Sequence, residues 1–229
     1  MDQRERRAEG EQPALTYRKL RLAVGVVGAA LPFVVVLGNL VLGGHGRLSS
    51  ISAYYYTPMG SYLVGSLCII GVFLLAYVYR GVPSAWMTWL APVGGVGALL
   101  AGLFPTPPTT GASHRQLLAG DVHAVGASVL FLVLGLISLL VFPVAVPSTT
   151  RLARENTAYR VLGALILASS AAALLVWLVA RRPFETHGLL FWFETVAVLA
   201  FSASWLVKGE AAAVVRSTVR RLISAPVRR

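Results

Sequence analysis

The sequence predicts an all-α fold, a polytopic membrane helical bundle of six transmembrane helices with both termini inside. Hydrophobic residues make up 56% of the 229 residues and charged residues only 13%, too little charge to cover a soluble domain of this size. The hydrophobic residues come in long blocks, and the basic residues gather at the ends of these blocks. Lipid must therefore be the solvent for much of the surface.

The chain divides into two polar tails and a membrane bundle between them. Residues 1–20 form a basic cytoplasmic tail, which we expect to be disordered up to about Thr16. Residues 208–229 form a second basic cytoplasmic tail. The predicted spans of the bundle, residues 21–207, are 21–43, 60–79, 86–105, 121–143, 159–180 and 187–207. Each span is long enough to cross roughly 30 Å of hydrocarbon at about 1.5 Å per residue.

The distribution of basic residues predicts the orientation of these spans. Of the 20 Lys and Arg residues, the outer loops hold four, which are Arg47, Arg115, Arg181 and Arg182. The excess on the inner side predicts a multi-pass protein of the bacterial cytoplasmic (inner) membrane. The net charge of +11 does not come with an interleaved aromatic patch, so we expect no nucleic-acid partner. Membrane lipids are the expected partners instead.

Small residues on the third span predict a helix contact. Gly94, Ala98 and Gly102 recur every four residues, so another helix can approach this face closely. That helix belongs to the same bundle, to a second copy of the chain or to another membrane protein. The single cysteine, Cys68, lies in an apolar block and excludes a disulfide framework within the chain.

The polar residues that carry chemistry gather toward the outer face. They are the histidines His45, His114, His123 and His187, the acids Asp121, Glu185 and Glu194, and the run from Ser49 to Tyr56. We take as candidate ligand-binding residues Ser50, Ser52, Tyr54, Tyr55, Tyr56, Asp121, His123, His187 and Glu194. Glu194 is the acid that falls clearly inside a span, where an ionisable residue is a functional hypothesis by default.

Depth estimates suggest how these residues are arranged. Counted from Lys208 along an ideal helix, His187 lies at the outer border and Glu194 about two turns deeper, on the same face. Counting back from Val144 places His123 at a depth similar to that of His187. Plain structural roles are also open: Glu194 as a paired buried group, the histidines as interfacial residues, and Asp121 as the N-cap of the fourth span.

Several functional interpretations share these residues. The catalytic candidates are His123, His187, Glu194 and Ser52, with Ser52 as the nucleophile of a hydrolase if a histidine lies beside it. A proton-coupled transporter would use Glu194 as its relay. We expect no cofactor, and a zinc or other divalent metal site would use at most His123, His187 and Asp121, without an HxxxH spacing to support it. Haem held by His123 and His187 is a further alternative.

Short motifs along the chain resemble a family of uncharacterised bacterial six-helix membrane proteins. They are LSSISAYYYTPM at 48–59, GVFLLAY at 71–77, DVHAVGA at 121–127, FET at 193–195 and SWLVKGE at 204–210. More distantly, they are similar to the Frag/DRAM/Sfk group of eukaryotic membrane proteins. The resemblance implies a six-helix bundle, in which Ser50, Ile51, Ser52 and Pro58 match a motif of the first outer loop and His123 matches a histidine that opens the fourth span. The eukaryotic group also implies a connection with membrane lipids.

The leading hypothesis is an outward-facing polar pocket, built from residues 44–59 and the outer ends of the fourth and sixth spans. We expect it to bind, and in a catalytic version to process, a lipid or other amphiphile of the outer leaflet. The alternatives are an ion- or proton-coupled transporter that uses Glu194 and a non-catalytic accessory subunit of a membrane complex.

Overall fold

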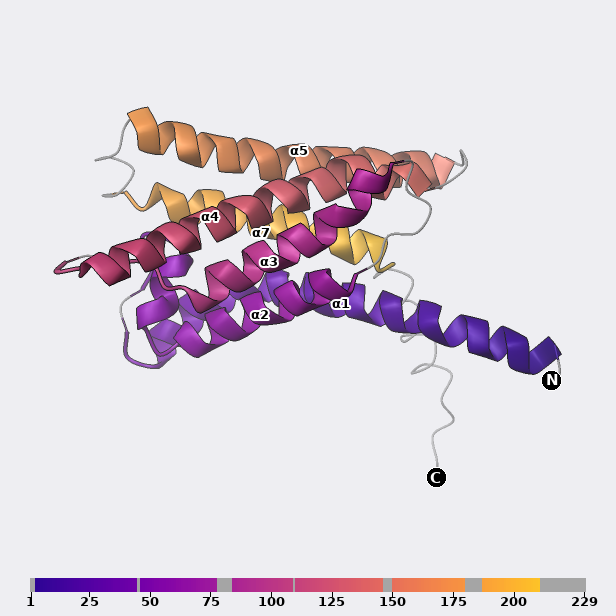
Figure 1. Ribbon diagram of the computed structural model, residues 1–229, viewed down its shortest axis with the longest axis horizontal. Coiled ribbons are helices and arrows are strands. Elements are labelled where there is room, and N and C mark those ends of the chain that lie inside the picture. Colours follow the sequence, from indigo (N-terminus) through magenta and orange to yellow (C-terminus); the bar gives the residue numbers. More distant parts are fainter. Residues whose placement is uncertain are drawn as a thin grey trace, which may run out of the picture.

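Six α-helices form the part of the chain that the computed structural model describes, residues 3–44, 46–77, 84–108, 110–145, 150–179 and 187–210 (Figure 1). They are α1 (Gln3–Val41), α2 (Gly60–Ala76), α3 (Leu90–Leu103), α4 (His114–Leu136), α5 (Thr150–Val179) and α7 (Leu189–Lys208). Short 3-10 helices at Ser52–Tyr56 and Ala85–Trp89 precede α2 and α3. A π-helical turn, Ile137–Val141, and a 3-10 turn, Phe142–Ala145, follow α4. These residues contain no strand, which confirms the predicted all-α class.

The lengths and hydropathy of these helices fit a multi-pass membrane protein. Five segments are long and apolar enough to cross a membrane: Arg18–Val41, Ala85–Leu103, His114–Val141, Arg154–Val176 and Leu189–Lys208. The sixth helix, α2, is equally apolar but has 17 residues. It stops before the predicted end at residue 79 because Tyr77 turns to an extended conformation. The predicted membrane bundle is therefore confirmed, with five helices of full span length and one shorter apolar helix.

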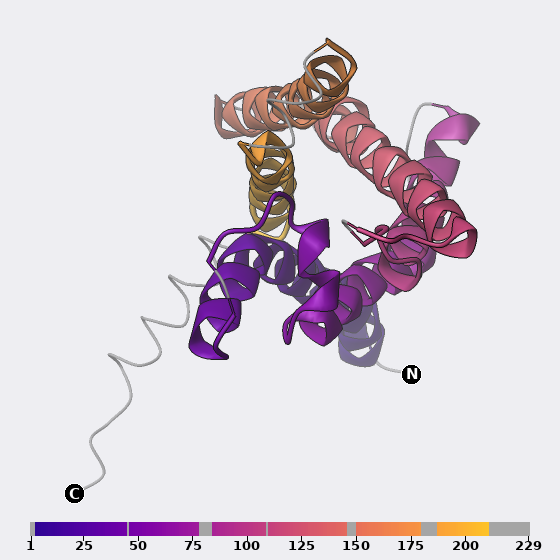
Figure 2. The ribbon, with the colours of Figure 1, turned by 90° about the vertical axis from the view of Figure 1, so that its left-hand side faces the viewer.

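The helices form a closed ring, which is visible from the end of the bundle in Figure 2. Each helix packs against its neighbours in the order α1, α2, α3, α4, α5, α7, and α7 packs back against α1. We call the end that holds Arg21, Lys208 and the start of α3 the inner end, and the opposite end, with the loop before α2, the outer end. Two clusters of buried side chains fill the ring, one toward each end.

Helices α3 and α4 approach each other closely through glycines. A Cβ atom on Gly97 would lie 2.8 Å from the Gly126 carbonyl oxygen, and one on Gly126 would lie 2.7 Å from Leu100 Cβ. The predicted small-residue face of α3 also packs inside the bundle. Gly94 faces Val133 of α4, Gly102 faces Leu67 of α2, and Ala98 is fully buried. This face is therefore occupied within the chain.

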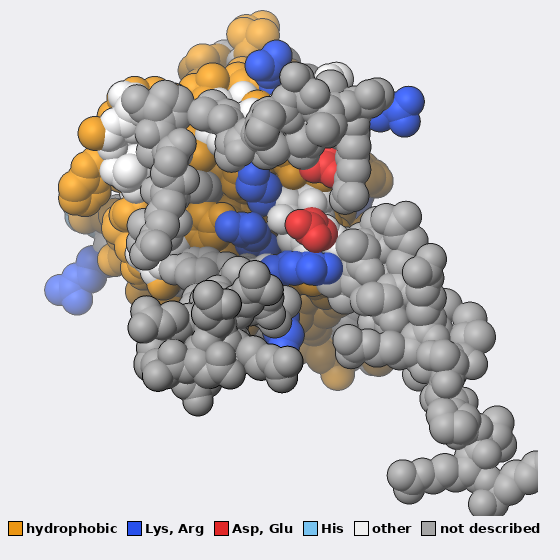
Figure 3. Space-filling model, turned by 90° about the vertical axis from the view of Figure 1, so that its right-hand side faces the viewer, with side chains coloured by type: hydrophobic (Ala, Val, Ile, Leu, Met, Phe, Trp, Pro, Cys, Tyr) orange, Lys and Arg blue, Asp and Glu red, His pale blue; other side chains and the backbone are white. Residues whose placement is uncertain are grey.

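An aromatic cluster fills the inner half of the ring. Trp205 is completely buried, with ring centroids 5.2–5.9 Å from those of Phe73, Tyr77, Phe142 and Phe201. Basic residues close the cluster at the inner end: Arg21 Nε donates to Tyr77 Oη at 2.8 Å, and Lys208 Nζ donates to the Phe142 carbonyl at 3.2 Å. Figure 3 shows Lys and Arg side chains gathered on this end, in line with the predicted charge asymmetry.

Several helix boundaries differ from the sequence predictions for local reasons. Helix α1 begins at Gln3, within the segment expected to be disordered, because its Arg, Glu, Gln and Ala residues favour the helix that the span continues. Helix α4 begins at His114, where Ser113 and Gln116 form a capping box. Asp121 therefore lies inside α4, and the prediction that it is an N-cap is wrong. Of the predicted C-terminal tail, residues 211–229 lie outside the described residues.

Candidate functional site

The loop between α1 and α2 folds into the outer end of the ring (Figure 2). Ser50 Oγ accepts a hydrogen bond from the Ala53 amide at 2.9 Å, which holds the start of the 3-10 helix Ser52–Tyr56. The Tyr54 side chain is fully buried, and its hydroxyl accepts from the Leu48 amide and donates to the Gly46 carbonyl, both at 3.1 Å. Ser50 and Tyr54, two of the predicted ligand-binding residues, thus serve to fold the loop.

The same loop is fixed to the start of α7. The Phe191 amide donates to the Ser49 carbonyl at 2.9 Å, and Arg47 Nη1 donates to the Gly188 carbonyl at 3.1 Å. The Arg47 guanidinium also lies over the rings of Phe191 and Trp192, 5.7 and 5.5 Å from their centroids. Gly188 is left-handed, with φ of 58°, so α7 begins after it rather than at His187.

The centre of the site is a chain of hydrogen bonds that joins three elements. Glu194 of α7 accepts from the Ile51 amide at 2.5 Å through Oε2, and its Oε1 lies 3.2 Å from Ser52 Oγ. Ser52 Oγ also lies 3.0 Å from Nε2 of His123, on α4. The other ring nitrogen of His123, Nδ1, lies 2.9 Å from the Phe104 carbonyl oxygen. Ser52 is the link between the acid and the histidine.

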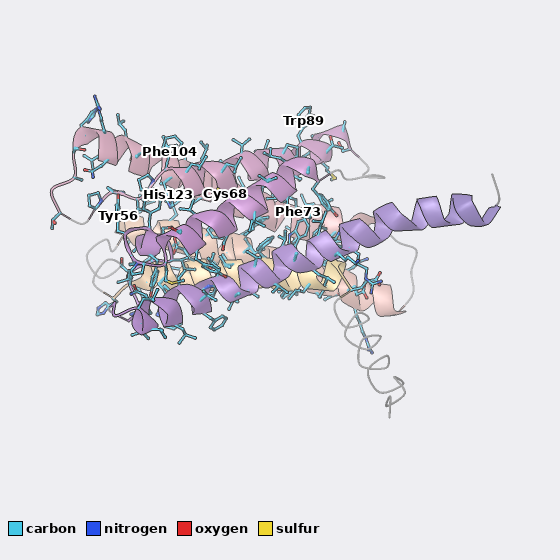
Figure 4. All side chains as sticks on the ribbon, turned by 90° about the horizontal axis from the view of Figure 1, so that it is seen from below. Tyr56, Cys68, Phe73, Trp89, Phe104 and His123 are labelled. Atoms are coloured by element: carbon cyan, nitrogen blue, oxygen red, sulfur yellow. The ribbon has the colours of Figure 1, made fainter. Side chains whose placement is uncertain are left out.

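Local structure explains why the Phe104 carbonyl is available to His123. Helix α3 ends at Leu103, and Phe104 is extended, with ψ of 122°, so its carbonyl points away from the helical hydrogen-bond ladder. His123 lies on the buried face of α4, and its side chain is 6% exposed. Figure 4 places Phe104 and His123 together at the end of the bundle that also carries Tyr56, far from Trp89.

Three of the four catalytic candidates therefore come together, and the fourth does not. Ser52, His123 and Glu194 share one network. His187 is exposed and meets the loop through its backbone carbonyl, which accepts from Arg47 Nη2 at 3.4 Å. His123 is thus connected to Glu194 through Ser52, and not to His187.

The remaining candidates lie around this network. Tyr56 is exposed, and its hydroxyl donates to the Thr106 carbonyl at 2.8 Å. Tyr55 is half-buried and packs edge-on against Tyr56, with ring centroids 5.3 Å apart. Asp121 is exposed on α4. His45 and Glu185 lie outside the described residues.

The metal hypothesis finds no ligand set in this region. Among the described residues, no group of three His, Cys, Asp or Glu side chains lies close enough to hold a metal ion. Both ring nitrogens of His123 already have hydrogen-bond partners, and Asp121 and His187 face outward.

Sequence reasoning missed the backbone partners of the site. The Ile51 amide and the Phe104 carbonyl belong to residues whose side chains give no sign of a polar role. Arg47 was counted only as an outer-loop charge, although it joins the loop to α7. A charged residue beside a predicted polar loop is the signal that could have drawn attention to it.

Comparison with known proteins places the chain in a family. Neither the curated proteins nor the solved structures give a significant match to it. A family model described as "Protein of unknown function (DUF998)" matches residues 26–208, from the second half of α1 to the end of α7, so the matched region contains the whole Ser52–His123–Glu194 network. The chain is thus a multi-pass helical membrane protein that belongs to the DUF998 family, in agreement with the expected uncharacterised family.

Proposed function

We propose that the protein binds the polar end of an amphiphile, such as a lipid of the outer leaflet, at Ser52, His123 and Glu194. The observation that carries this proposal is the continuous hydrogen-bond chain from Glu194 through Ser52 to His123. Polar groups inside a membrane bundle are expensive, and three of them from separate elements exceed what packing requires. A headgroup that replaces one of these hydrogen bonds can donate to or accept from the hydroxyl, the imidazole or the carboxyl group.

The surroundings of the site suit the apolar part of such a molecule. On α4, the side chains of Leu117, Leu118 and Val125 are exposed on the outer half of the helix. On α7, Trp192 and Val196 are exposed at the level of Glu194. In a membrane these side chains face acyl chains, so a headgroup at Ser52 would leave its tail in an apolar environment.

The proposal is tested by native mass spectrometry of the detergent-solubilised protein with added phosphatidylethanolamine or phosphatidylglycerol. We expect Ser52→Ala to weaken the affinity for the preferred lipid roughly 5- to 30-fold, because about 1–2 kcal/mol of hydrogen bonding is lost. The matched control is Ser138→Ala, which removes a buried serine hydroxyl that bonds Ser204 in the inner half. If Ser52→Ala retains each lipid as well as the wild type and Ser138→Ala do, the proposal is contradicted.

A second candidate function, acyl transfer through Ser52, is favoured by the contact with His123. Because a carbonyl can only accept, Nδ1 of His123 must carry a proton toward Phe104, which leaves Nε2 to face the Ser52 hydroxyl at 3.0 Å. In this step Nε2 takes the hydroxyl proton while Ser52 Oγ attacks an ester carbonyl, and the leaving alcohol recovers that proton. The carboxyl group differs from a hydrolase triad, since Glu194 bonds the serine and not the histidine.

A fluorophosphonate probe separates binding from acyl transfer, because it modifies activated serines covalently. If Ser52 is a nucleophile, the probe labels the wild type and Ser138→Ala but not Ser52→Ala or His123→Gln. If the wild type binds lipid and remains unlabelled, acyl transfer is excluded and binding stands alone.

The transport alternative lacks support from the inner half of the ring. A proton or ion path from Glu194 would have to continue to the inner end, where Trp205 and the rings around it pack edge to face. Such packing leaves a path few polar groups to follow. The accessory-subunit alternative would need a face other than that of Gly94, Ala98 and Gly102, which packs within the chain.

A further inference from the structure

The hydrogen bonds around Ser52 require one proton more than a neutral His123, an ionised Glu194 and the Ser52 hydroxyl supply. Nδ1 of His123 must carry a hydrogen, because its partner is the Phe104 carbonyl oxygen. If the histidine is neutral and Glu194 is ionised, both Nε2 and Oε1 are acceptors. The Ser52 hydroxyl has a single hydrogen, and it lies within bonding distance of both acceptors, at 3.0 and 3.2 Å. One of the two hydrogen bonds then cannot form.

One additional proton completes the network in either of two ways. If it sits on Glu194, Oε1 donates to Ser52 Oγ, and the serine hydroxyl donates to Nε2 of His123. If it sits on His123, Nε2 donates to Ser52 Oγ, and the serine donates to an ionised Glu194. The two states interconvert when the proton on one end passes to Oγ and the Oγ proton passes to the other end. No atom other than hydrogen moves, and the total charge is unchanged.

The net charge of the site gives a second, independent argument. With the additional proton the three groups sum to zero charge, either as neutral groups or as an imidazolium and carboxylate pair. Without it, the site carries one negative charge within the bundle, and an uncompensated charge there is costly. Among the described residues, Glu194 forms no ion pair that would offset this charge, and the pair of Arg18 with Glu210 lies at the inner end.

The charged and titratable groups that the structure describes around the network provide no counter-ion for it. Arg47 of the loop is cationic, but its guanidinium donates to the carbonyls of Gly188 and His187. Asp121 of α4 and His187 before α7 are exposed. Helix α3 and the outer half of α5 carry no charged residue. The other titratable groups described on the neighbouring elements at the outer end are the exposed His114 and Arg115 of α4, Tyr54, Tyr55 and Tyr56 of the loop, and Tyr62 of α2. Asn39 of α1 is a further buried polar group.

We propose that Glu194, Ser52 and His123 together form a binding site for one proton, shared through the Ser52 hydroxyl. The bound proton completes the contacts that hold the outer loop to α4 and α7. This site does not depend on a bound amphiphile and goes beyond the proposed function, since the donor count holds for the protein alone.

The test locates the proton by two spectroscopic measurements near neutral pH. Replacing His45, His114 and His187 by Gln leaves His123 as the only histidine of the four, so ¹⁵N NMR of the histidine-labelled protein in nanodiscs shows whether its ring is singly or doubly protonated. Infrared spectra of the unaltered chain, with and without ¹³C-glutamate, show whether a protonated glutamic acid is present. Glu194→Gln assigns that band, and Glu210→Gln is the matched control at an exposed site.

We expect one of these two signatures and not the other: a protonated Glu194 with a singly protonated His123, or an ionised Glu194 with a doubly protonated His123. On raising the pH, either state should convert in a single one-proton step. An ionised Glu194 beside a singly protonated His123 at neutral pH would overturn the proposal, and so would two bound protons. If the unaltered protein shows the one-proton signature but retains neither lipid, only the proposed function is overturned.

Discussion

At the scale of single residues, Glu194 connects the last described helix to the outer loop through both carboxyl oxygens. One oxygen accepts from the Ile51 amide, and the other meets Ser52. The Ile51 amide of the loop thereby bonds this carboxyl group directly, and the His123 side chain of α4 is connected to it through Ser52. Removing the carboxyl group leaves the Ile51 amide without a partner and leaves the Ser52 hydroxyl with His123 alone, in a partly buried region. An unpaired buried amide costs more than the hydrogen bond alone.

Two substitutions of Glu194 should therefore differ sharply in stability. Glu194→Ala should lower the free energy of unfolding by about 1–3 kcal/mol, because it leaves the Ile51 amide unpaired. Glu194→Gln should cost much less, since its amide oxygen can accept from Ile51 while its NH₂ group donates to Ser52, as a protonated glutamic acid would. Thermal unfolding in the same detergent measures both. Equal losses for the two variants would contradict the donor count.

The sequence could predict the types of side chain in the site but not their partners. The position of Glu194 within a span, and the gathering of serines and histidines toward one end, follow from hydropathy alone. Which histidine meets Ser52 depends on helix rotation and on the fold of the loop. His187 was placed on the helix with Glu194, but the left-handed Gly188 separates it from α7.

At the scale of helices, the close contact between α3 and α4 constrains the position of His123. The Gly97 and Gly126 backbones touch one turn below His123 on α4. Any side chain at Gly126 would displace α4 from α3, and the Phe104 carbonyl at the end of α3 would move away from the histidine.

Gly126→Val should destabilise the protein by about 1–3 kcal/mol through overpacking and should also weaken lipid retention. The control is Gly65→Val on α2, where an added Cβ would meet nothing within 4 Å. Thermal unfolding measures the loss of stability, and native mass spectrometry measures the retained lipid. A Gly65 variant as unstable as the Gly126 variant would show that the loss does not come from this helix contact.

Helix boundaries were predicted less accurately than helix positions. The apolar blocks locate each of the six described helices, because burial in lipid or in the bundle dominates over local propensity. The ends depend on single capping residues, such as Ser113 and Gln116 at the start of α4, which lie outside the apolar block. A prediction based on hydropathy alone thus starts α4 too late and assigns the cap to Asp121.

At the scale of the whole molecule, the ring has a basic inner end (Figure 3), and the Ser52–His123–Glu194 network lies at its outer end. The orientation in the membrane is tested with single cysteines in a Cys68→Ser background, since Cys68 is the only cysteine of the chain. We expect a membrane-impermeant maleimide to label Thr110→Cys in intact cells and Glu210→Cys only after permeabilisation, because positive residues remain on the inner side. Both positions are exposed. The reverse pattern would contradict the predicted topology.

The attachment of the outer loop also has a consequence for the order in which the protein is completed during synthesis. The loop leaves the ribosome early, but its partners His123 and Glu194 follow 71 and 142 residues after Ser52. The loop therefore has to wait at the membrane surface, with its polar groups unpaired, until α4 and finally α7 have been inserted. Closure of the loop then marks the arrival of α7, and a chain that stalls before Glu194 would expose a segment that quality-control proteases can recognise.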